Sequence, residues 1–180
     1  MEEMVPRMFS FNSPYGACQK CDGLGSHMEV DPNLIVPDKS KSLIQGAIAS
    51  LGEQPRGNWY GSILKSLSRH YKFNFSTQWI KMDPKVRQIL LYGTGEQKFK
   101  MDYSSERWSG TYSGGWEGAI PNLMRRYTQT KSSGIREWIE QFMSMRPCSD
   151  CKGARLRKQT LGVMINEKNI GHVSSMSIRD

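Results

Sequence analysis

The chain has 180 residues, of which 37% are hydrophobic, and it carries a net charge of +8. This length allows one domain with a sizeable core, or a small stapled module with one insertion. Its apolar runs are too short to span a bilayer, and the first residues lack the charged-then-apolar pattern of a signal peptide. We therefore expect a cytoplasmic protein, with no membrane partner and with reduced thiols.

The first half of the chain is expected to be mainly loops and helices. Loops should carry the first cysteine pair, an extended segment should follow from Asp31 to Asp38, and a short helix should run from Ser40 to Gly46 or Ala49. Apolar residues at helical spacing predict a helix from Trp59 to Tyr71, with Asn58 as its N-cap. A further helix is expected to begin at Pro84 and to end at Gly93.

The second half adds a hairpin to the helices. Alternation from Lys98 to Tyr103 predicts a strand, and the Gly- and Ser-rich residues 109–118 predict a β-hairpin or ribbon. Pro121 and Asn122 should begin a helix, and Ser132 or Ser133 should cap the next one, which Pro147 ends. A strand is then expected at Leu161 to Ile165, followed by a turn at residues 166–169 and a helix start at residues 174–180.

The chain contains four cysteines, arranged as two matched pairs. Cys18 and Cys21 form one CxxC, Cys148 and Cys151 form the other, and a glycine follows each pair after one residue. A CxxC loop directs two thiolates toward one centre, and the glycine permits a tight turn. Two such half-sites form the tetrahedral four-sulfur set that suits Zn²⁺, so we expect one structural zinc ion per chain.

The cysteines have two alternative uses besides a metal site. They could be free thiols, or one pair could be a redox motif, but a redox CxxC usually opens a helix after a strand and neither pair does. Four thiolates leave no open position for water, so the expected metal is structural and no catalytic residue is assigned. No phosphate-binding loop of the form GxxxxGK[ST] occurs in the sequence.

Together these signals predict an α+β chain. Residues 1–30 and 147–180 are expected to form a small four-cysteine zinc module, the second part including the strand that follows the cysteines. A mixed helical insertion domain with a short β-hairpin, at residues 31–146, interrupts this module. The insertion lies within the 126 residues from Asp22 to Pro147, whose two ends one ion would hold together.

The positive charge indicates a polyanionic partner such as DNA. Residues 120–160 contain nine basic and three acidic side chains, and aromatic residues are interleaved with bases around Phe99 and Trp108. Such mixing suits phosphate contact and base stacking. A solubilising surface explains the charge alone equally well. The predicted DNA-binding residues are Lys98, Lys100, Arg107, Arg125, Arg126, Arg155, Arg157 and Lys158.

Three separated blocks of sequence resemble the UvrA family, the damage-sensing ATPase subunits of bacterial nucleotide excision repair. They are residues 9–25, around the first cysteine pair, residues 121–130, which read PNLMRRYTQT, and residues 146–156, around the second pair. Their order and spacing also match, and the resemblance covers nearly the whole chain. The first pair also fits one CxxCxGxG unit of DnaJ-type co-chaperones, but those carry four closely spaced units.

The resemblance implies a role for the chain within a larger machine. It implies a zinc module of the first ATPase half, split by an insertion domain that lies along the DNA-binding face. It also implies damaged double-stranded DNA, UvrB and a second UvrA chain as partners of the whole protein, and ATP as its cofactor. The ATPase motifs themselves are missing, so the sequence reads as a fragment without its own ATP site. The alternative is a structural or protein-interaction module that makes no direct contact with DNA.

Overall fold

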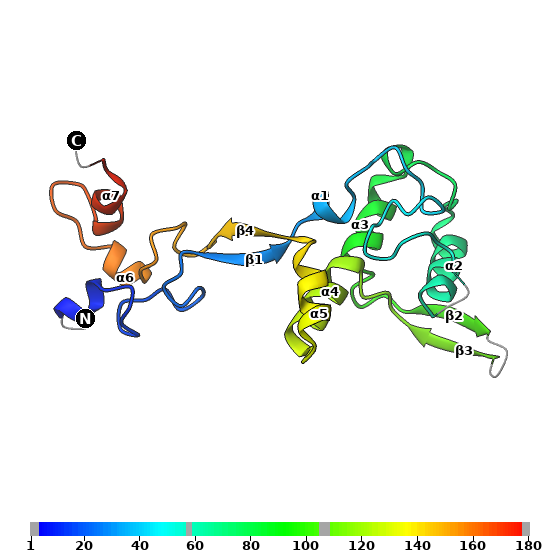
Figure 1. Ribbon diagram of the computed structural model, residues 1–180, viewed down its shortest axis with the longest axis horizontal. Coiled ribbons are helices and arrows are strands. Elements are labelled where there is room, and N and C mark those ends of the chain that lie inside the picture. The colour runs from blue at the N-terminus through cyan, green and yellow to red at the C-terminus, as the bar shows by residue number, and fades with distance from the viewer. Residues whose placement is uncertain (1–3, 57–58, 105–108, 178–180) are drawn as a thin grey trace. The chain divides into compact units, whose positions relative to one another are not determined.

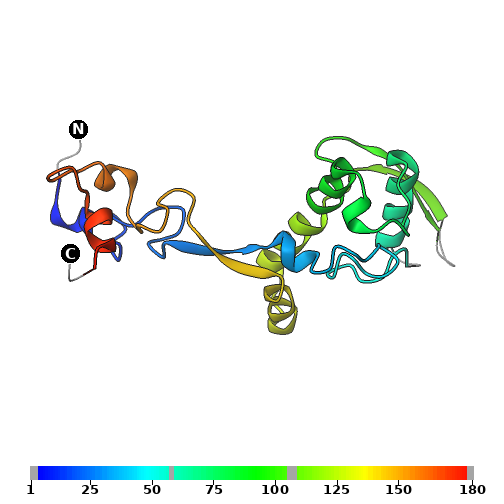
Figure 2. The same cartoon turned by 90° about the horizontal axis from the view of Figure 1, so that it is seen from above.

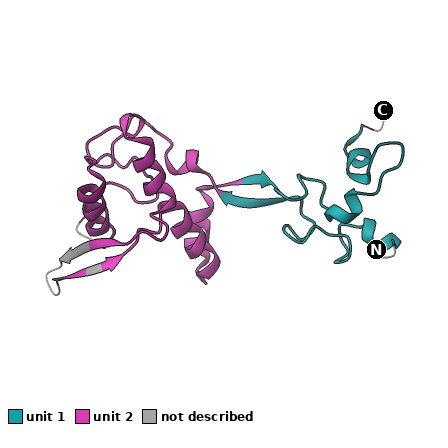
Figure 3. Ribbon diagram, turned by 180° about the vertical axis from the view of Figure 1, so that it is seen from behind, with its two compact units in different colours: residues 1–29, 145–180 teal, residues 30–144 magenta. Residues whose placement is uncertain are grey.

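The computed structural model describes residues 4–56, 59–104 and 109–177 and divides the chain into two compact units (Figure 3). Unit 1 contains residues 1–29 and 145–180, and unit 2 contains residues 30–144. The chain contains helices and two small two-stranded sheets, which confirms the predicted α+β class (Figure 1).

Unit 1 is built from both ends of the chain and holds short elements only. They are the 3₁₀ helix η1 (Pro6–Phe9) and the helices α6 (Lys158–Leu161) and α7 (Ile170–Ser175). The strands β1 (Ser26–Val30) and β4 (Met143–Pro147) pair as a two-stranded sheet, in which the boundary between the units falls. With so little secondary structure, unit 1 depends on its loops and on the cysteine cluster described below.

Unit 2 is mainly helical, and side chains cap several of its helices. Asp31, Asp83 and Ser132 each accept a backbone N–H of the helix that follows. The elements are α1 (Pro32–Ile35), α2 (Trp59–Tyr71), η2 (Trp79–Lys81), α3 (Pro84–Tyr92), β2 (Phe99–Ser104), β3 (Ser109–Gly114), α4 (Ala119–Gln129) and α5 (Ser133–Glu140).

A β-hairpin is present, but it begins earlier than predicted: the strand expected at residues 98–103 is its first strand, and residues 109–114 form only its second. Strands β2 and β3 are antiparallel, with Phe99 opposite Gly114 and Ser104 opposite Ser109. Helix α2 packs against β2, although η2 and α3 separate the two in the chain (Figures 1 and 2).

The core of unit 2 lies among α2, α3, α4 and the loops between them. Trp116 is buried, its indole Nε1 donates to the carbonyl of Leu90 at 3.1 Å, and its ring meets the edge of Tyr60. The loop that carries Trp116 approaches the end of α3 so closely that a side chain at Gly93 would collide with it, and φ is +94° there. The fully buried apolar side chains of this core are Ile35, Leu43, Ile48, Leu64, Leu67, Leu90 and Ile139.

Two expected features near the start of unit 2 are wrong. The segment from Asp31 is not extended, because Asp31 caps helix α1. Ser40 to Ala49 form turns in place of a helix, since the side chain of Gln45 accepts from both the backbone N–H and the hydroxyl of Ser42. Such local side-chain bonds compete with the helical ladder.

Three expectations in the second half also need correction. Pro147 does not end a helix, because α5 stops at Glu140 and residues 143–147 pair as a strand with β1. Helix α4 begins at Ala119, before Pro121. The strand expected at 161–165 is absent: helix α6 ends at Leu161, and residues 162–165 are turn and loop apart from an isolated bridge between Ile165 and Lys168. Within α6 the buried Thr160 hydroxyl donates to the carbonyl of Met8 at 2.9 Å. The cap proposed at Asn58 lies outside the described residues.

Candidate metal centre and basic side chains

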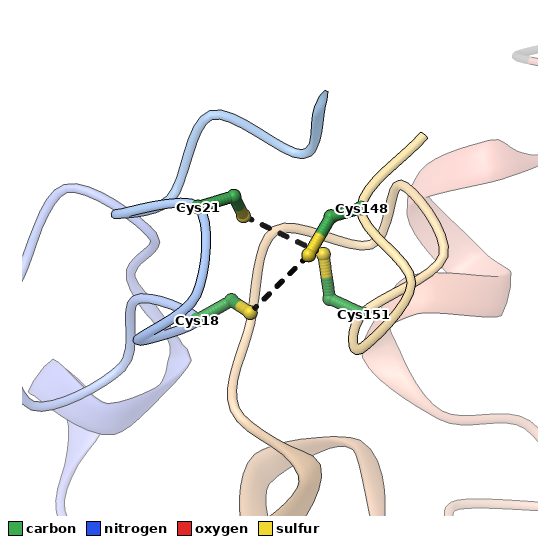
Figure 4. Close-up of side chains that lie close together, drawn as sticks. All are labelled: Cys18, Cys21, Cys148 and Cys151. Atoms are coloured by element: carbon green, nitrogen blue, oxygen red, sulfur yellow. Dashed lines mark hydrogen bonds between the residues drawn. The ribbon is translucent and has the colours of Figure 1, made fainter. Parts of the chain in front are cut away.

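The two cysteine pairs meet in unit 1 with all four sulfur atoms within 4.8 Å of one another (Figure 4). The Sγ atoms of Cys18 and Cys148 are 3.9 Å apart, and those of Cys21 and Cys151 are 3.7 Å apart. A disulfide needs an S–S distance of about 2.05 Å. Bonds of about 2.3 Å to a tetrahedral zinc place sulfurs about 3.8 Å apart. The arrangement therefore matches a metal site, and the four cysteines can hold one ion.

The two CxxC loops have the same backbone turn. The residue after each second cysteine, Asp22 or Lys152, has φ near +50°, and the following Gly23 and Gly153 have φ of +77° and +93°. Glycine adopts this left-handed region without the steric cost that other residues meet. The glycine after each pair therefore has the turning role that the sequence predicted.

Backbone N–H groups prepare part of this cluster for negative charge. The amides of Cys151 and Asp150 lower the pKa of Cys148 from 9.0 to about 6, because they stabilise its thiolate. Burial raises the pKa of Cys21 from 9.0 to about 12, although the Gly25 amide donates to its sulfur at 3.2 Å. All four side chains are buried. A bound cation would offset the unfavourable free energy of holding several thiolates in a buried site.

Hydrogen bonds outside the cluster join the two ends of the chain. The amide of Cys18 donates to the carbonyl of Arg155 at 2.9 Å, and the amide of Cys148 donates to the carbonyl of Gly25 at 2.9 Å. The Nζ of Lys20 donates to the hydroxyl of Ser149 at 2.7 Å. These bonds fix the two loops in register, so the cluster does not depend on the sulfur atoms alone.

Two of the predicted DNA-binding arginines belong to this framework. The guanidinium of Arg155 lies 3.6 Å from the ring centroid of Phe11, and its Nε donates to the carbonyl of Gly23 at 2.7 Å. Arg157 donates to the carbonyls of Ala17 and Pro14. Both side chains thus hold the first cysteine loop in place, a role that does not need DNA.

Replacing Arg157 by alanine should therefore destabilise unit 1 by about 2 kcal/mol, because two carbonyls lose a charged donor. Lys158→Ala is the matched control. It removes the same charge from the next residue, whose exposed side chain forms no hydrogen bond or ion pair within the described residues, so we expect a change within about 0.5 kcal/mol. Hydrogen exchange of the amides of residues 16–25 would measure both effects. Equal effects of the two variants would contradict the structural role of Arg157.

The two predicted arginines of α4 also have protein partners. Arg125 forms a bidentate pair with Glu117, with Nε and Nη2 at 2.8 and 3.1 Å from its two oxygens. This pair lowers the pKa of Glu117, whose carboxylate also accepts from Asn122. The guanidinium of Arg126 lies 5.5 Å from the ring centroid of Trp138. Both arginines therefore contribute to packing within unit 2.

The predicted lysines are different. The side chains of Lys98 and Lys100 are exposed, and within residues 4–56, 59–104 and 109–177 neither ammonium group forms a hydrogen bond or an ion pair. Arg107 lies outside the described residues. The seven predicted residues that the structure describes are divided between the units. Unit 1 contains Arg155, Arg157 and Lys158, and unit 2 contains Lys98, Lys100, Arg125 and Arg126.

A family model described as the UvrA DNA-binding domain matches residues 31–141, more than half of the chain. This chain belongs to that family. The resemblance carried by the three sequence blocks is thereby confirmed, and the matched segment lies within unit 2.

Curated relatives extend the match to both units of the UvrA family chain. The UvrABC system protein A of Clostridium perfringens (strain 13 / Type A) is 43% identical over 182 residues, which cover 100% of this chain. The proteins of that name from Brucella abortus (strain 9-941) and Methanothermobacter thermautotrophicus are 42% and 43% identical over 98% and 99% of it. The chain spans only 18–19% of the length of these relatives.

A solved structure has the same fold as this UvrA family chain. The crystal structure of UvrA2 from Deinococcus radiodurans aligns with a TM-score of 0.69 over 97% of this chain and 22% of that one, at 23% sequence identity. At this identity the likeness shows the fold alone. Among the helices within the described residues, none is both long and apolar enough to cross a membrane.

One group of residues near the predicted lysines was missed by the sequence reasoning. Ser66, Arg69 and His70 on α2 line a cavity of about 390 Å³ together with Lys98, Phe99 and Lys100. No sequence pattern links His70 to residues almost thirty positions away. The packing of α2 on β2 brings these residues together, and that packing was not predictable from spacing.

Proposed function

We propose that this chain is the zinc-stapled DNA-binding segment of a UvrA subunit and that it contributes to recognition of damaged DNA in nucleotide excision repair. The single observation that carries the proposal is the match of residues 31–141 to the UvrA DNA-binding domain. One structural Zn²⁺ would be held by Cys18, Cys21, Cys148 and Cys151, whose sulfur separations fit tetrahedral coordination.

The zinc ion would have a structural role and no catalytic one. Four thiolate ligands fill its coordination sphere, so no position remains to activate water. The ion would hold the two segments of unit 1 together, residues 1–29 and 145–180, and unit 2 between them would present its basic side chains to DNA. A cytoplasmic location, where thiols stay reduced, agrees with this use of cysteine.

Contact with DNA would be through phosphates and would not depend on sequence. Lysines without protein partners are point charges that attract phosphate oxygens and carry no base-reading geometry. Among the predicted residues, Lys98, Lys100 and Lys158 have this character, and we keep Arg107 as a further candidate. Discrimination of damage would then depend on the shape and stiffness of the duplex. In the whole protein, ATP hydrolysis and the contacts with UvrB and a second UvrA chain would lie outside these residues.

The experiment is duplex binding by the zinc-loaded chain as salt is raised from about 50 to about 200 mM. Fluorescence anisotropy with two unrelated duplexes should give equal affinities that fall with salt, at a slope of about −0.9 for each phosphate neutralised. A damaged duplex should bind at least as tightly as its undamaged match. Absence of binding at low salt, or an affinity that ignores salt, would contradict direct DNA contact.

A structural or protein-interaction module is the second candidate, and one observation favours it. Arg125, Arg126, Arg155 and Arg157 all have intramolecular partners. Under this alternative the lysines serve solubility only, so removing their charge would leave duplex affinity unchanged.

A further inference from the structure

A cavity lies between helix α2 and strand β2 of unit 2. Figures 1 and 2 show the helix beside the strand. The volume of the cavity is about 390 Å³. This value lies within the range of about 300–1,000 Å³ that is usual for small-ligand sites. The last turns of α2 form one wall, and the residues at the start of β2 form the other.

The lining of this cavity is cationic. It contains Lys98, Lys100, Arg69 and His70, and no carboxylate from the described residues reaches it. Lys98 and Lys100 flank Phe99 in sequence, and both ammonium groups lack a partner within the part of the chain that the structure describes. An anion that entered would thus meet two positive charges that need not first give up a protein partner.

The remaining lining groups shape the cavity. Phe99 is only 6% exposed, and the ring of His70 stacks on it with centroids 5.8 Å apart. This stacked pair forms an apolar wall beside the two exposed lysines, in a site that is open to solvent. Ser66 accepts from Arg69 at 3.2 Å, and Arg69 and His70 lie in the last turn of α2, where cations stabilise the helix end.

Because Arg69 and His70 have that structural role, Lys98 and Lys100 are the groups that we expect to bind an anion. We infer that this cavity is a phosphate-binding pocket that takes one backbone phosphate of a nucleic acid, with Lys98 and Lys100 as its ligands. The inference deepens the proposed function and depends on it. Lysine ammonium groups bind phosphate as point charges, so the pocket would position the duplex without reading its bases.

The test compares two double variants of the zinc-loaded chain. Lys98→Gln with Lys100→Gln removes the pocket charges, and Lys81→Gln with Lys85→Gln removes the same charge from two other exposed lysines of unit 2. Duplex affinity measured by anisotropy should fall roughly tenfold in the first variant, with a salt slope smaller by about one, and much less in the second. Lys98→Arg with Lys100→Arg should keep most of the affinity, and tryptophan fluorescence should show all variants folded.

A second measurement uses inorganic phosphate as the probe. NMR amide shifts of residues 66–71 and 98–100 should move on its addition in the wild-type chain and stay fixed in the K98Q/K100Q variant. Equal loss of duplex affinity in the two glutamine variants would overturn the pocket and leave the proposed DNA binding intact. Phosphate-induced shifts with unchanged duplex affinity would contradict the nucleic-acid assignment and identify a free-anion site. A wild-type chain that binds no duplex would overturn the proposed function itself, and the pocket assignment with it.

Discussion

A chain that carries Cys148→Ser should lose its metal and the fold of unit 1, while unit 2 stays folded. Cys148 is fully buried and supplies one of the four sulfurs. Structural zinc sites contribute apparent free energies of about 10–16 kcal/mol, and a serine hydroxyl is a poor substitute for a thiolate. The described residues of unit 1 form only short elements, so the metal site would supply most of its stability beside the hydrogen bonds that join its two segments.

The placement of tryptophan makes this result measurable for each unit separately. All five tryptophans lie between residues 59 and 138, so their fluorescence reports unit 2 alone. In the C148S chain the fluorescence unfolding midpoint should be unchanged. Hydrogen exchange should instead show loss of protection at the amides of Cys18, Cys148 and Arg157, which donate across unit 1.

Ser149→Ala is the matched control for this variant. It alters the neighbouring exposed residue, whose hydroxyl only accepts from Lys20. We expect it to retain the metal and the exchange protection. Retained protection in C148S, or loss of protection in S149A as large as in C148S, would show that the sulfur cluster does not hold unit 1 together.

The second large effect is expected in the core of unit 2. Leu64→Ala should lower the free energy of unfolding by about 2–5 kcal/mol, since Leu64 is fully buried and its truncation leaves a cavity among α2 and its neighbours. Urea unfolding followed by tryptophan fluorescence would measure the loss. Unit 1 should keep its exchange protection, because its own bonds and cysteines are unaffected.

Leu34→Ala makes the same chemical change at a side chain that is 40% exposed. We expect it to cost under about 1 kcal/mol. If the two leucine variants were equally destabilised, or if L64A unfolded at the wild-type urea concentration, the assigned core would be wrong.

Local signals predicted the elements whose causes are local. The apolar stripe from Trp59 to Tyr71 gave α2, and Asp83 before Pro84 gave the start of α3. The alternation after Lys98 gave the hairpin strand. In each case a cap or a periodic face within a few residues is enough to specify the structure.

The failures occurred where distant residues decide the structure. Residues 143–147 were expected to end the helix that Ser132 caps, yet they pair with β1, which lies more than a hundred residues earlier. Thr160 sits in a helix because its hydroxyl meets the carbonyl of Met8 from the other end of the chain. No local pattern contains such information, and propensity gives way to tertiary pairing.

The sequence was enough to predict the cysteine cluster, whereas it did not predict what the basic residues contact. Two CxxC motifs specify a shared site because four buried thiolates have few stable uses. Arginine side chains have many stable uses. The four described arginines that were predicted to bind DNA contact Glu117, Trp138, Gly23 and Ala17 within the chain. Reversal of Arg125 and Arg126 to glutamate would place acids beside Glu117, so a loss of DNA binding would not by itself show phosphate contact.

The most direct test of this account is the metal content of the purified wild-type chain, measured by elemental analysis together with an anomalous signal at the zinc edge. The account predicts one zinc ion per chain, at the centre of Cys18, Cys21, Cys148 and Cys151. A chain that is folded in both units and contains no zinc, or a zinc signal away from these four sulfurs, would contradict it.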